Sequence, residues 1–415
     1  MIDGSLPDHR RPSFSFSGEP MHIAQKIRSI PPSATLAVNA KAQELTAQGK
    51  KIISLAVGEP DFPTPEHVRQ AAKDALDQGF TRYTPVPGIP ALRKTVADYF
   101  AGIAGQGEVP AEATMICNGG KHALYNLFQA LLEPGDPVLI PAPYWVSYPP
   151  MVLLAEGKPT VIPSTPERRF LITPEDLERH APPGAQGARV LLLNSPSNPT
   201  GCHYSQDELD ALIGWALERD IFVISDEIYD QLVYPPARPS SAVSWWVKFP
   251  DKIAVVNGLS KSMAMTGWRI GYVLAHPDLI KAMVRIQGQS TSNVCSITQK
   301  AALAALTGPM DSLREMRVAF QRRRDLALKK ITSWPGVVCP KPDGAFYLFP
   351  RLDALFTKDR NDSAALCTYI LERAGVALVP GVAFGDDRCV RFSYALDDET
   401  LITALDLVQN ALLDA

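Results

Sequence analysis

Between residues 66 and 300 the sequence alternates helical stretches with short, nearly continuous apolar runs, and this alternation restricts the fold more than any other feature. Such runs are typical of strands buried on both faces, as in a parallel sheet covered by helices. We predict strands at Thr114 to Cys117, Val138 to Ile140, Val190 to Leu193, Phe222 to Ile224 and Ile253 to Val256. The sequence therefore predicts an α/β fold with a mostly parallel sheet between helices.

The two ends of the chain differ from this central region. Residues 1–20 are polar, contain Pro and Ser and lack periodicity, which predicts a flexible leader. An Ala- and Lys-rich stretch from Thr35 to Gln48 predicts a helix that ends at Gly49. After about residue 305, a long charged helix through EMRVAFQRRRDLALKK precedes the alternating segment CVRFSYA, which predicts a smaller α+β domain.

Length and charge exclude several classes of protein. A chain of 415 residues is long enough for two or three domains. Its 41 Lys and Arg residues are balanced by 44 Asp and Glu residues, which argues against binding to nucleic acid or to an anionic membrane. No apolar run approaches the roughly 18 residues that a membrane span needs. We expect small-molecule partners, with neither nucleic acid nor membrane among them.

The six cysteines are spread along the chain without a close pair or a Cys/His cluster of metal-ligand spacing. Reduced thiols are therefore expected, and no metal site is predicted. The first twenty residues contain acidic side chains and no apolar segment of the kind found in secretion signals. We expect a cytoplasmic protein.

The residues that directly follow the predicted strands are the candidates for function, because ligands of open α/β sheets bind outside the carboxyl ends of the strands. Four such loops stand out, namely NGGKHAL, NSPSNPTG, SDEIYDQL and NGLSKSMAMTGWRIGY. Together they supply glycines at a helix start, amides, a carboxylate with a phenol, and a lysine with an arginine.

The first of these loops suits a phosphate. Gly119 and Gly120 permit a close backbone approach, and the helix that follows exposes N–H groups and the positive end of its dipole. Lys121 lies in the first turn of that helix, where a cation opposes the dipole, and this favours an anion nearby. An ordinary strand–turn–helix connection with a solvated lysine is the alternative.

The later loops contain residues that have both a chemical and a structural interpretation. Lys261 is followed by Arg269, and a lysine desolvated beside another cation becomes a nucleophile able to form a Schiff base, whereas most lysines are solvated. Asp226 follows a buried run, so its carboxylate needs a partner, which an ordinary salt bridge would also supply. Tyr229 and Asn198, taken singly, are explained equally well as a packed ring and a turn former.

In combination, these loops form part of a longer series of motifs. The series is SATLAVNAKA, GEPDFPTP, YTPVPGIPALR, GGKHAL, PYWVSYP, SNPTG, SDEIY, SKSMAMTGWRIGY, GAFY and VRFSYA. It resembles the fold-type I aminotransferases of class I and II, which use pyridoxal phosphate (PLP), and most of all the bacterial-type aspartate aminotransferases of the aspartate/prephenate aminotransferase group. The resemblance extends from about Ser33 to Leu405. It implies a flexible leader over residues 1–30, a small domain of residues 31–60 and 305–415, and a large PLP-binding domain over residues 61–304.

The resemblance also implies which residues would hold and activate the cofactor. Lys261 would bind PLP as an internal aldimine and then act as general acid and base. Asp226 would keep the pyridine nitrogen protonated, while Tyr229 and Asn198 would hydrogen-bond the ring 3-oxygen. Trp145 would stack on the ring.

Two anion sites follow from the same resemblance. The cofactor phosphate would be bound by the backbone of Gly120 and Lys121, by Ser260, by Arg269, and by Tyr83 of a second subunit. This last contact requires a homodimer. The substrate α-carboxylate would bind Arg391 in a bidentate contact, together with a backbone group of Gly58. Strand alternation agrees, since it puts Arg391 on the opposite face from its apolar neighbours.

The side chain of the substrate is addressed by three further residues. In the enzymes that this chain resembles, the lysine of GGK and the hydroxyls of SAT contact the distal carboxylate of an acidic substrate. The resemblance implies that Lys121, Ser33 and Thr35 would do so here. We therefore predict a ping-pong transaminase that uses L-aspartate and L-glutamate as donors, with oxaloacetate and 2-oxoglutarate as keto partners. The alternatives are amination of prephenate, a broader specificity for aromatic or neutral amino acids, and PLP-dependent lyase chemistry.

Three positions depart from the common pattern of the resembling enzymes. Gly258 stands where many members have a phosphate-binding serine, Val294 replaces a frequent proline, and Val382 replaces a common serine. The central residues are unaffected, so these departures bear on cofactor affinity and substrate preference.

Overall fold

The computed structural model describes residues 21–413 except residues 29, 33, 106 and 182–186. The side chains of residues 25, 34–36 and 39 are also outside that description. The first twenty residues of the predicted leader therefore lie outside the described residues, and the residues that follow contain a short helix, α1 (Gln25–Arg28). Within the described part of the chain, no helix combines the length and the apolar character that crossing a membrane requires.

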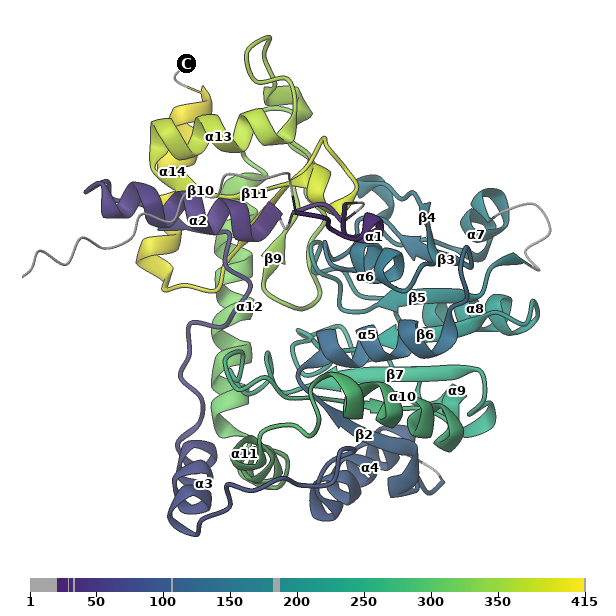
Figure 1. Ribbon diagram of the computed structural model, residues 1–415. Coiled ribbons are helices and arrows are strands. Elements are labelled where there is room, and N and C mark those ends of the chain that lie inside the picture. Colours follow the sequence, from purple (N-terminus) through teal and green to yellow (C-terminus); the bar gives the residue numbers. More distant parts are fainter. Residues whose placement is uncertain (1–20, 29, 33, 106, 182–186, 414–415) are drawn as a thin grey trace, which may run out of the picture.

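In these residues, a seven-stranded sheet forms the centre of the larger part of the molecule (Figure 1). Its spatial order is β2-β8-β7-β6-β5-β3-β4, and all strands are parallel except β8, which is antiparallel to both neighbours. The predicted, mostly parallel sheet is confirmed, and each of the five predicted runs forms a strand. The strands are β2 (Thr114–Cys117), β3 (Pro137–Pro141), β4 (Lys158–Ile162), β5 (Val190–Asn194), β6 (Phe222–Asp226), β7 (Ile253–Gly258) and β8 (Gly271–Leu274).

Two strands of this sheet are not predicted by the sequence pattern. β4 lies at the edge of the sheet, contains Pro159 and is partly exposed, so it lacks a continuous apolar run. β8 is only four residues long and begins at a glycine, within the motif SKSMAMTGWRIGY, whose residues predict a functional loop. Short edge strands and glycine-containing strands have weak sequence signals.

Helices cover both faces of the sheet and create two apolar cores. One core includes residues of α5 (Gly120–Leu131), α6 (Tyr148–Leu154) and α10 (Pro277–Ser290). The other includes residues of α3 (Glu66–Asp77), α4 (Pro90–Ala104), α7 (Pro174–His180), α8 (Gln206–Leu217), α9 (Val243–Lys248) and α11 (Ser296–Thr307). Within β6, Val223 belongs to one core while Phe222 and Ile224 belong to the other. This explains why the buried strands are apolar throughout.

A smaller group of strands joins segments that are far apart in the sequence. β1 (Ile53–Ser54) pairs in parallel with β10 (Val376–Ala377), while β11 (Val379–Pro380), β12 (Val390–Ser393) and β9 (Tyr347–Leu348) form an antiparallel sheet. Around them lie α2 (Ala34–Ala47), α12 (Asp311–Ile331), α13 (Ser363–Ala374) and α14 (Asp398–Leu413), so α2 from the N-terminal part of the chain and α13 and α14 from the C-terminal part lie together in the upper part of Figure 1. The smaller α+β part is confirmed, and the predicted domain boundaries stay a prediction.

A close backbone contact between β8 and α5 sets the position of the loops at this end of the sheet. A Cβ at Gly271 would lie 2.4 Å from the backbone N of Gly120 and 2.5 Å from the carbonyl C of Gly119. Real Cβ atoms do not approach backbone so closely, so only glycine fits here while α5 keeps its place. Gly271 therefore determines how near the start of α5 lies to the sheet.

We predict that Gly271→Ala destabilises the apoprotein by about 1–3 kcal/mol, because the added methyl group must push α5 away from β8. Denaturant unfolding followed by circular dichroism measures the free energy of unfolding. Gly214→Ala is the control, since Gly214 lies within α8 with open space at its Cβ position and alanine is favoured in helices by about 1 kcal/mol. Equal stability of Gly271→Ala and the unsubstituted protein would contradict the packing argument.

Candidate active site

The carboxyl ends of parallel strands bring the predicted loops to one edge of the large sheet (Figure 1). β2 ends at Cys117, just before α5, while β5 ends at Asn194, β6 at Asp226 and β7 at Gly258. The Asn194 side chain donates to the Asp226 carbonyl oxygen at 2.9 Å and accepts from the Asn198 backbone N–H at 2.9 Å. The loop that carries Asn198 is thereby held against β6.

Asp226 ends β6 and is 4% exposed. Its Oδ2 accepts a hydrogen bond from the Tyr148 hydroxyl at 2.7 Å, and its Oδ1 accepts one from the Ile228 backbone N–H at 3.3 Å. Burial raises the pKa of Asp226 to about 6, although these hydrogen bonds and the nearby Lys261 act to lower it. A buried carboxyl group of this kind is suited to a partner that is itself a cation or a proton carrier.

Lys261 follows β7 and lies among charges from both parts of the molecule. Burial lowers the pKa of its amine to about 8, the charge of Arg391 adds to this shift, and Glu59 and Asp226 oppose it. The amine donates a hydrogen bond to the Gly58 carbonyl oxygen. An amine that is neutral in a sizeable fraction of molecules near neutral pH is suited to act as a nucleophile and as a base.

Tyr229 is 3% exposed and lies beside Lys261, whose Nζ is 5.9 Å from the centre of the Tyr229 ring. The hydroxyl groups of Tyr229 and Tyr347 form a hydrogen bond of 2.9 Å. Burial raises the pKa of Tyr229 well above its ordinary value. The phenol is therefore neutral and able to donate a hydrogen bond.

Arg391 in β12 is 2% exposed, and the described residues place no carboxylate within ion-pair distance of it. Its guanidinium donates to the Asn198 Oδ1 at 3.0 Å and to the Ala56 carbonyl oxygen at 2.6 Å, while its Nε has no hydrogen-bond partner there. The rings of Tyr347 and Phe384 have their centres 4.7 and 5.1 Å from the guanidinium. Burying an unpaired charge is costly, so this position is suited to an anion such as a carboxylate.

Further cationic and polar side chains lie around the start of α5. Gly119 is the N-cap of α5 with φ +86°, and a Cβ there would lie 2.7 Å from the Nη2 of Arg269. Arg269 donates to the Thr266 carbonyl oxygen at 2.9 Å and has no ion-pair partner in the described part of the chain. Ser260 is 8% exposed and directly precedes Lys261. A helix start with an arginine against it is typical of a phosphate site.

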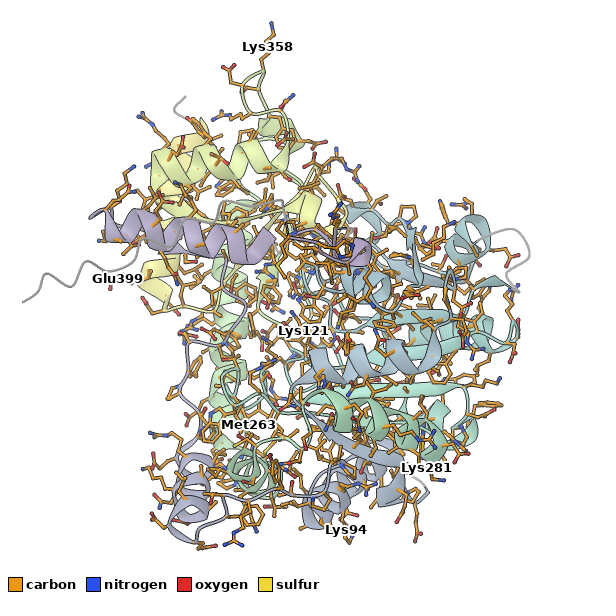
Figure 2. All side chains as sticks on the ribbon, in the orientation of Figure 1. Lys94, Lys121, Met263, Lys281, Lys358 and Glu399 are labelled. Atoms are coloured by element: carbon orange, nitrogen blue, oxygen red, sulfur yellow. The ribbon has the colours of Figure 1, made fainter. Side chains whose placement is uncertain are left out.

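Lys121 lies in the first turn of α5, near the centre of the molecule in Figure 2. Its amine is 4.9 Å from the centre of the Trp145 ring. Burial lowers the pKa of Lys121, and the charge of Arg269 lowers it further. Trp145 meets Tyr148 edge-on, with 5.3 Å between the ring centres. The Trp145 ring therefore contacts both the Lys121 amine and Tyr148, whose hydroxyl donates to Asp226.

Some predicted residues are not placed at the site by this chain. Tyr83 is 91% exposed, so its predicted contact with a phosphate depends on a second copy. Ser33 lies outside the described residues, and Thr35 belongs to α2 but its side chain is not described. Gly58 does reach the site, although its carbonyl oxygen accepts from Lys261. The roles expected for these four residues stay predictions.

The sequence reasoning missed two tyrosines that contact the site. Tyr148 donates a hydrogen bond to Asp226, and the hydroxyl of Tyr347 forms a hydrogen bond with that of Tyr229. Both residues belong to motifs named above, PYWVSYP and GAFY. A signal was therefore present, but only the tertiary structure shows that these hydroxyl groups face Asp226 and Tyr229.

The departures from the common pattern have different explanations. A Cβ at Gly258 would lie 3.0 Å from the Gly271 Cα and from the Ile270 carbonyl oxygen, so a serine here would press on β8. Glycine at this position is therefore explained by packing. Val294 is buried and Val382 is 53% exposed, and nothing in the structure explains these two replacements.

The residues present fit PLP at each of its functional groups. Asp226 is a buried acid that would suit the ring nitrogen, and Lys261 is an amine with a lowered pKa that would suit the aldehyde. Arg269 against the start of α5 suits the phosphate, and the unpartnered Nε of Arg391 suits a substrate carboxylate. A mostly parallel sheet with this set at its carboxyl edge defines a PLP-dependent enzyme of the aminotransferase type.

Comparisons with known proteins identify the family. The model for aminotransferase class I and II matches residues 50–408, and the chain belongs to this family. The aspartate aminotransferase of Geobacillus stearothermophilus is 44% identical over 389 residues, which cover 94% of this chain and 98% of that protein. The aspartate/prephenate aminotransferase of Cereibacter sphaeroides is 43% identical over 394 residues, which cover 93% and 98%.

A solved structure gives the same result. The aspartate aminotransferase of Thermus thermophilus with maleate superposes with a TM-score of 0.88 at 41% identity, and covers 95% of this chain and 100% of that one. The chain is a PLP-dependent aminotransferase, so the predicted enzyme class, fold class and cofactor are confirmed.

We predict that Asp226→Asn changes how the stability of the apoprotein depends on pH. The pKa of Asp226 in the folded protein, about 6, lies above the ordinary 3.8, so its contribution to stability is present at low pH and is lost as the pH rises through 6. Asparagine does not titrate. The free energy of unfolding of Asp226→Asn relative to the unsubstituted protein should therefore rise by about 2–3 kcal/mol from about pH 4 to about pH 7.

Chemical denaturation of the apoproteins over this pH range measures the difference. Asp251→Asn serves as the control, because it makes the same substitution at an exposed position just before β7. If the Asp226→Asn difference changed with pH no more than that of the control, the raised pKa of Asp226 would be refuted.

Proposed function

We propose that the protein transfers an amino group between L-aspartate or L-glutamate and 2-oxo acids, with oxaloacetate and 2-oxoglutarate as keto partners, in a ping-pong reaction. One observation carries the proposal. The charge of Arg269 lowers the pKa of Lys121, and the charges of Arg391 and Arg269 lower the pKa of Lys261. The described residues give none of these four cations an ion-pairing carboxylate. One phosphate and the two carboxylates of a dicarboxylic substrate match this set of charges.

PLP, when bound, supplies a ring that accepts the electron pair left after removal of the substrate α-proton. We assign Lys261 to hold the cofactor and to move the proton at its Nζ, because a pKa of about 8 lets the amine both accept and release a proton near neutral pH. Asp226 would hold positive charge on the pyridine nitrogen, with its Oδ2 fixed by Tyr148. Tyr229 and Trp145 would contact the 3-oxygen and the face of the ring.

The contacts of Asn198 support its assignment to the same 3-oxygen. Its Oδ1 accepts a hydrogen bond from Arg391. The two N–H groups of its Nδ2 are then available as donors, which is what an oxygen of the cofactor requires. Asn198 would therefore contact the cofactor at one end of its amide and the substrate-binding arginine at the other.

The cofactor phosphate is assigned to the start of α5. The backbone of Gly120 and Lys121, the hydroxyl of Ser260 and the guanidinium of Arg269 would bind it. Tyr83 would reach the same phosphate from a second copy of the chain, and its 91% exposure supports this. We therefore propose a homodimer with shared active sites.

The substrate is assigned to two cations on either side of the reacting centre. Arg391 would bind the α-carboxylate, together with a backbone group of Gly58. Lys121 would bind the distal carboxylate, with Ser33 and Thr35. Support for Lys121 comes from its place over the Trp145 ring and from its lowered pKa, which its burial explains.

Amination of prephenate is the second candidate function, favoured by the likeness to the Cereibacter sphaeroides enzyme, which is named for aspartate and prephenate. Prephenate also has a carboxylate on its side chain, so the same cation could bind it. A panel of amino donors tested against 2-oxoglutarate and prephenate separates the two, and includes aromatic and neutral donors. Release of ammonia and pyruvate from a donor with a leaving group would instead identify a lyase.

We also propose a cytoplasmic location. All six cysteines are free thiols, two of them not fully buried. Thiols remain reduced in reducing compartments, and disulfides are typical of oxidising ones.

We predict that Lys261→Ala lowers the rate of transamination by at least about 10²- to 10⁴-fold, because no other amine can replace its acid–base role. Initial rates with L-aspartate and 2-oxoglutarate measure this, together with the absorbance spectrum of the protein mixed with PLP. Lys281→Ala is the matched control, since Lys281 is 71% exposed and lies at the periphery of Figure 2. Full activity of Lys261→Ala would overturn the assignment.

We predict that Lys121→Ala lowers kcat/KM for aspartate and glutamate by roughly ten- to a hundredfold, and affects alanine and aromatic donors much less, because a charge-assisted contact to the distal carboxylate is lost. Steady-state kinetics with the donor panel measure this. Lys248→Ala is the control, because Lys248 makes the same kind of contact with Trp245, 5.5 Å from its ring centre, on α9. An equal loss for all donors would show that Lys121 mainly serves the phosphate.

A further inference from the structure

Two buried phenols meet between the large sheet and the small sheet. Tyr229 follows β6, and Tyr347 lies in β9, where it pairs with Ser393 of β12. The two hydroxyl oxygens are 2.9 Å apart, which is a hydrogen bond. Each hydroxyl has one proton, so only one of the two phenols can donate to the other.

Tyr347 borders two further residues of the site. Alternation along β12 puts Ser393 and Arg391 on one face of the small sheet, and Tyr347, which pairs with Ser393, lies on that face too. The Arg391 guanidinium is 4.7 Å from the centre of the Tyr347 ring. A Cβ on Gly58 would lie 2.9 Å from the Tyr347 hydroxyl oxygen, so this hydroxyl occupies the space that a larger residue at 58 would need.

The groups around Tyr229 leave one direction for the shared hydrogen bond. Tyr347 from β9, Arg391 from β12, Asp226 from β6 and Lys261 after β7 all face the phenol. If Tyr229 gives its proton to the ring 3-oxygen, its own oxygen remains to accept, and Tyr347 is the donor within reach. A hydroxyl that accepts a hydrogen bond is polarised and becomes a better donor.

We propose that Tyr347 is a positioning residue whose hydroxyl donates to Tyr229, and so orients and strengthens the hydrogen bond from Tyr229 to the ring 3-oxygen of PLP. The ring of Tyr347 has a separate role, because it packs against the guanidinium of Arg391. The inference rests on the function proposed above. It adds to that function the residue Tyr347, which positions Tyr229, one of the residues assigned to contact the cofactor.

The holoenzyme provides a readout that a merely structural role would not change. Weaker donation to the 3-oxygen leaves more negative charge on that oxygen, and the bound cofactor then retains its proton to higher pH. In Tyr347→Phe, which removes only the oxygen, the pH midpoint of the cofactor absorbance titration should therefore rise by roughly half a unit to one unit. Affinity for maleate, measured by absorbance, should change less than about twofold because the ring stays over Arg391.

Two further variants separate the hydroxyl from the ring and from general effects on the core. Tyr347→Leu removes both features, so it should raise the midpoint equally and also weaken maleate binding by roughly five- to thirtyfold. Tyr394→Phe is the matched control, since Tyr394 is another buried phenol of the same core, 1% exposed, with its hydroxyl 3.4 Å from the Ala345 carbonyl oxygen. It should leave both the midpoint and the maleate affinity unchanged.

A double-mutant cycle tests whether Tyr347 acts through Tyr229. Tyr229→Phe should raise the midpoint more than Tyr347→Phe does, and adding Tyr347→Phe to it should produce no further shift. Additive shifts, or a Tyr347→Phe midpoint equal to that of Tyr394→Phe, would overturn the inference. The proposed function fails separately, if the unsubstituted holoenzyme shows no conversion of its cofactor absorbance with L-aspartate.

Discussion

The structure depends on keeping positive charge buried without an acidic residue to neutralise it. Arg391 is almost fully buried, yet only neutral oxygens and aromatic rings of the described residues contact its guanidinium. Lys261 responds to the same surroundings with a lowered pKa. Such an arrangement costs stability in the free protein and is offset when anions bind. The fold therefore keeps buried positive charge at this edge of the sheet, where it can attract an anion.

Side-chain hydrogen bonds between the two parts of the molecule hold this arrangement in place. Asn198, after β5, accepts from Arg391 in β12, and Tyr229, after β6, shares a hydrogen bond with Tyr347 in β9. The partners in each pair come from distant parts of the sequence: one follows a strand of the large sheet, and the other lies in a strand of the small sheet. The groups proposed to contact the cofactor and the arginine proposed to bind the substrate carboxylate are thus connected by hydrogen bonds.

The sequence was informative where a residue type has few structural uses. The buried strands were readable as apolar runs, and Asp226 and Lys261 could be singled out because charges that follow such runs need an explanation. Tyr148 and Tyr347 could not be assigned in the same way, because a tyrosine in an apolar context is usually a packed ring. Their hydroxyl groups acquire a role only through partners that lie 78 and 118 residues away.

By itself, the sequence determined the class of fold, the order of the loops and the inventory of charged groups, because these depend on local periodicity and residue type. The tertiary structure alone decided which of these groups meet. It buried Arg391 without a carboxylate in reach, lowered the pKa of Lys261 and raised that of Asp226. The reason is that desolvation and hydrogen bonding depend on distances between residues far apart in the chain, and such distances exist only after the strands have paired.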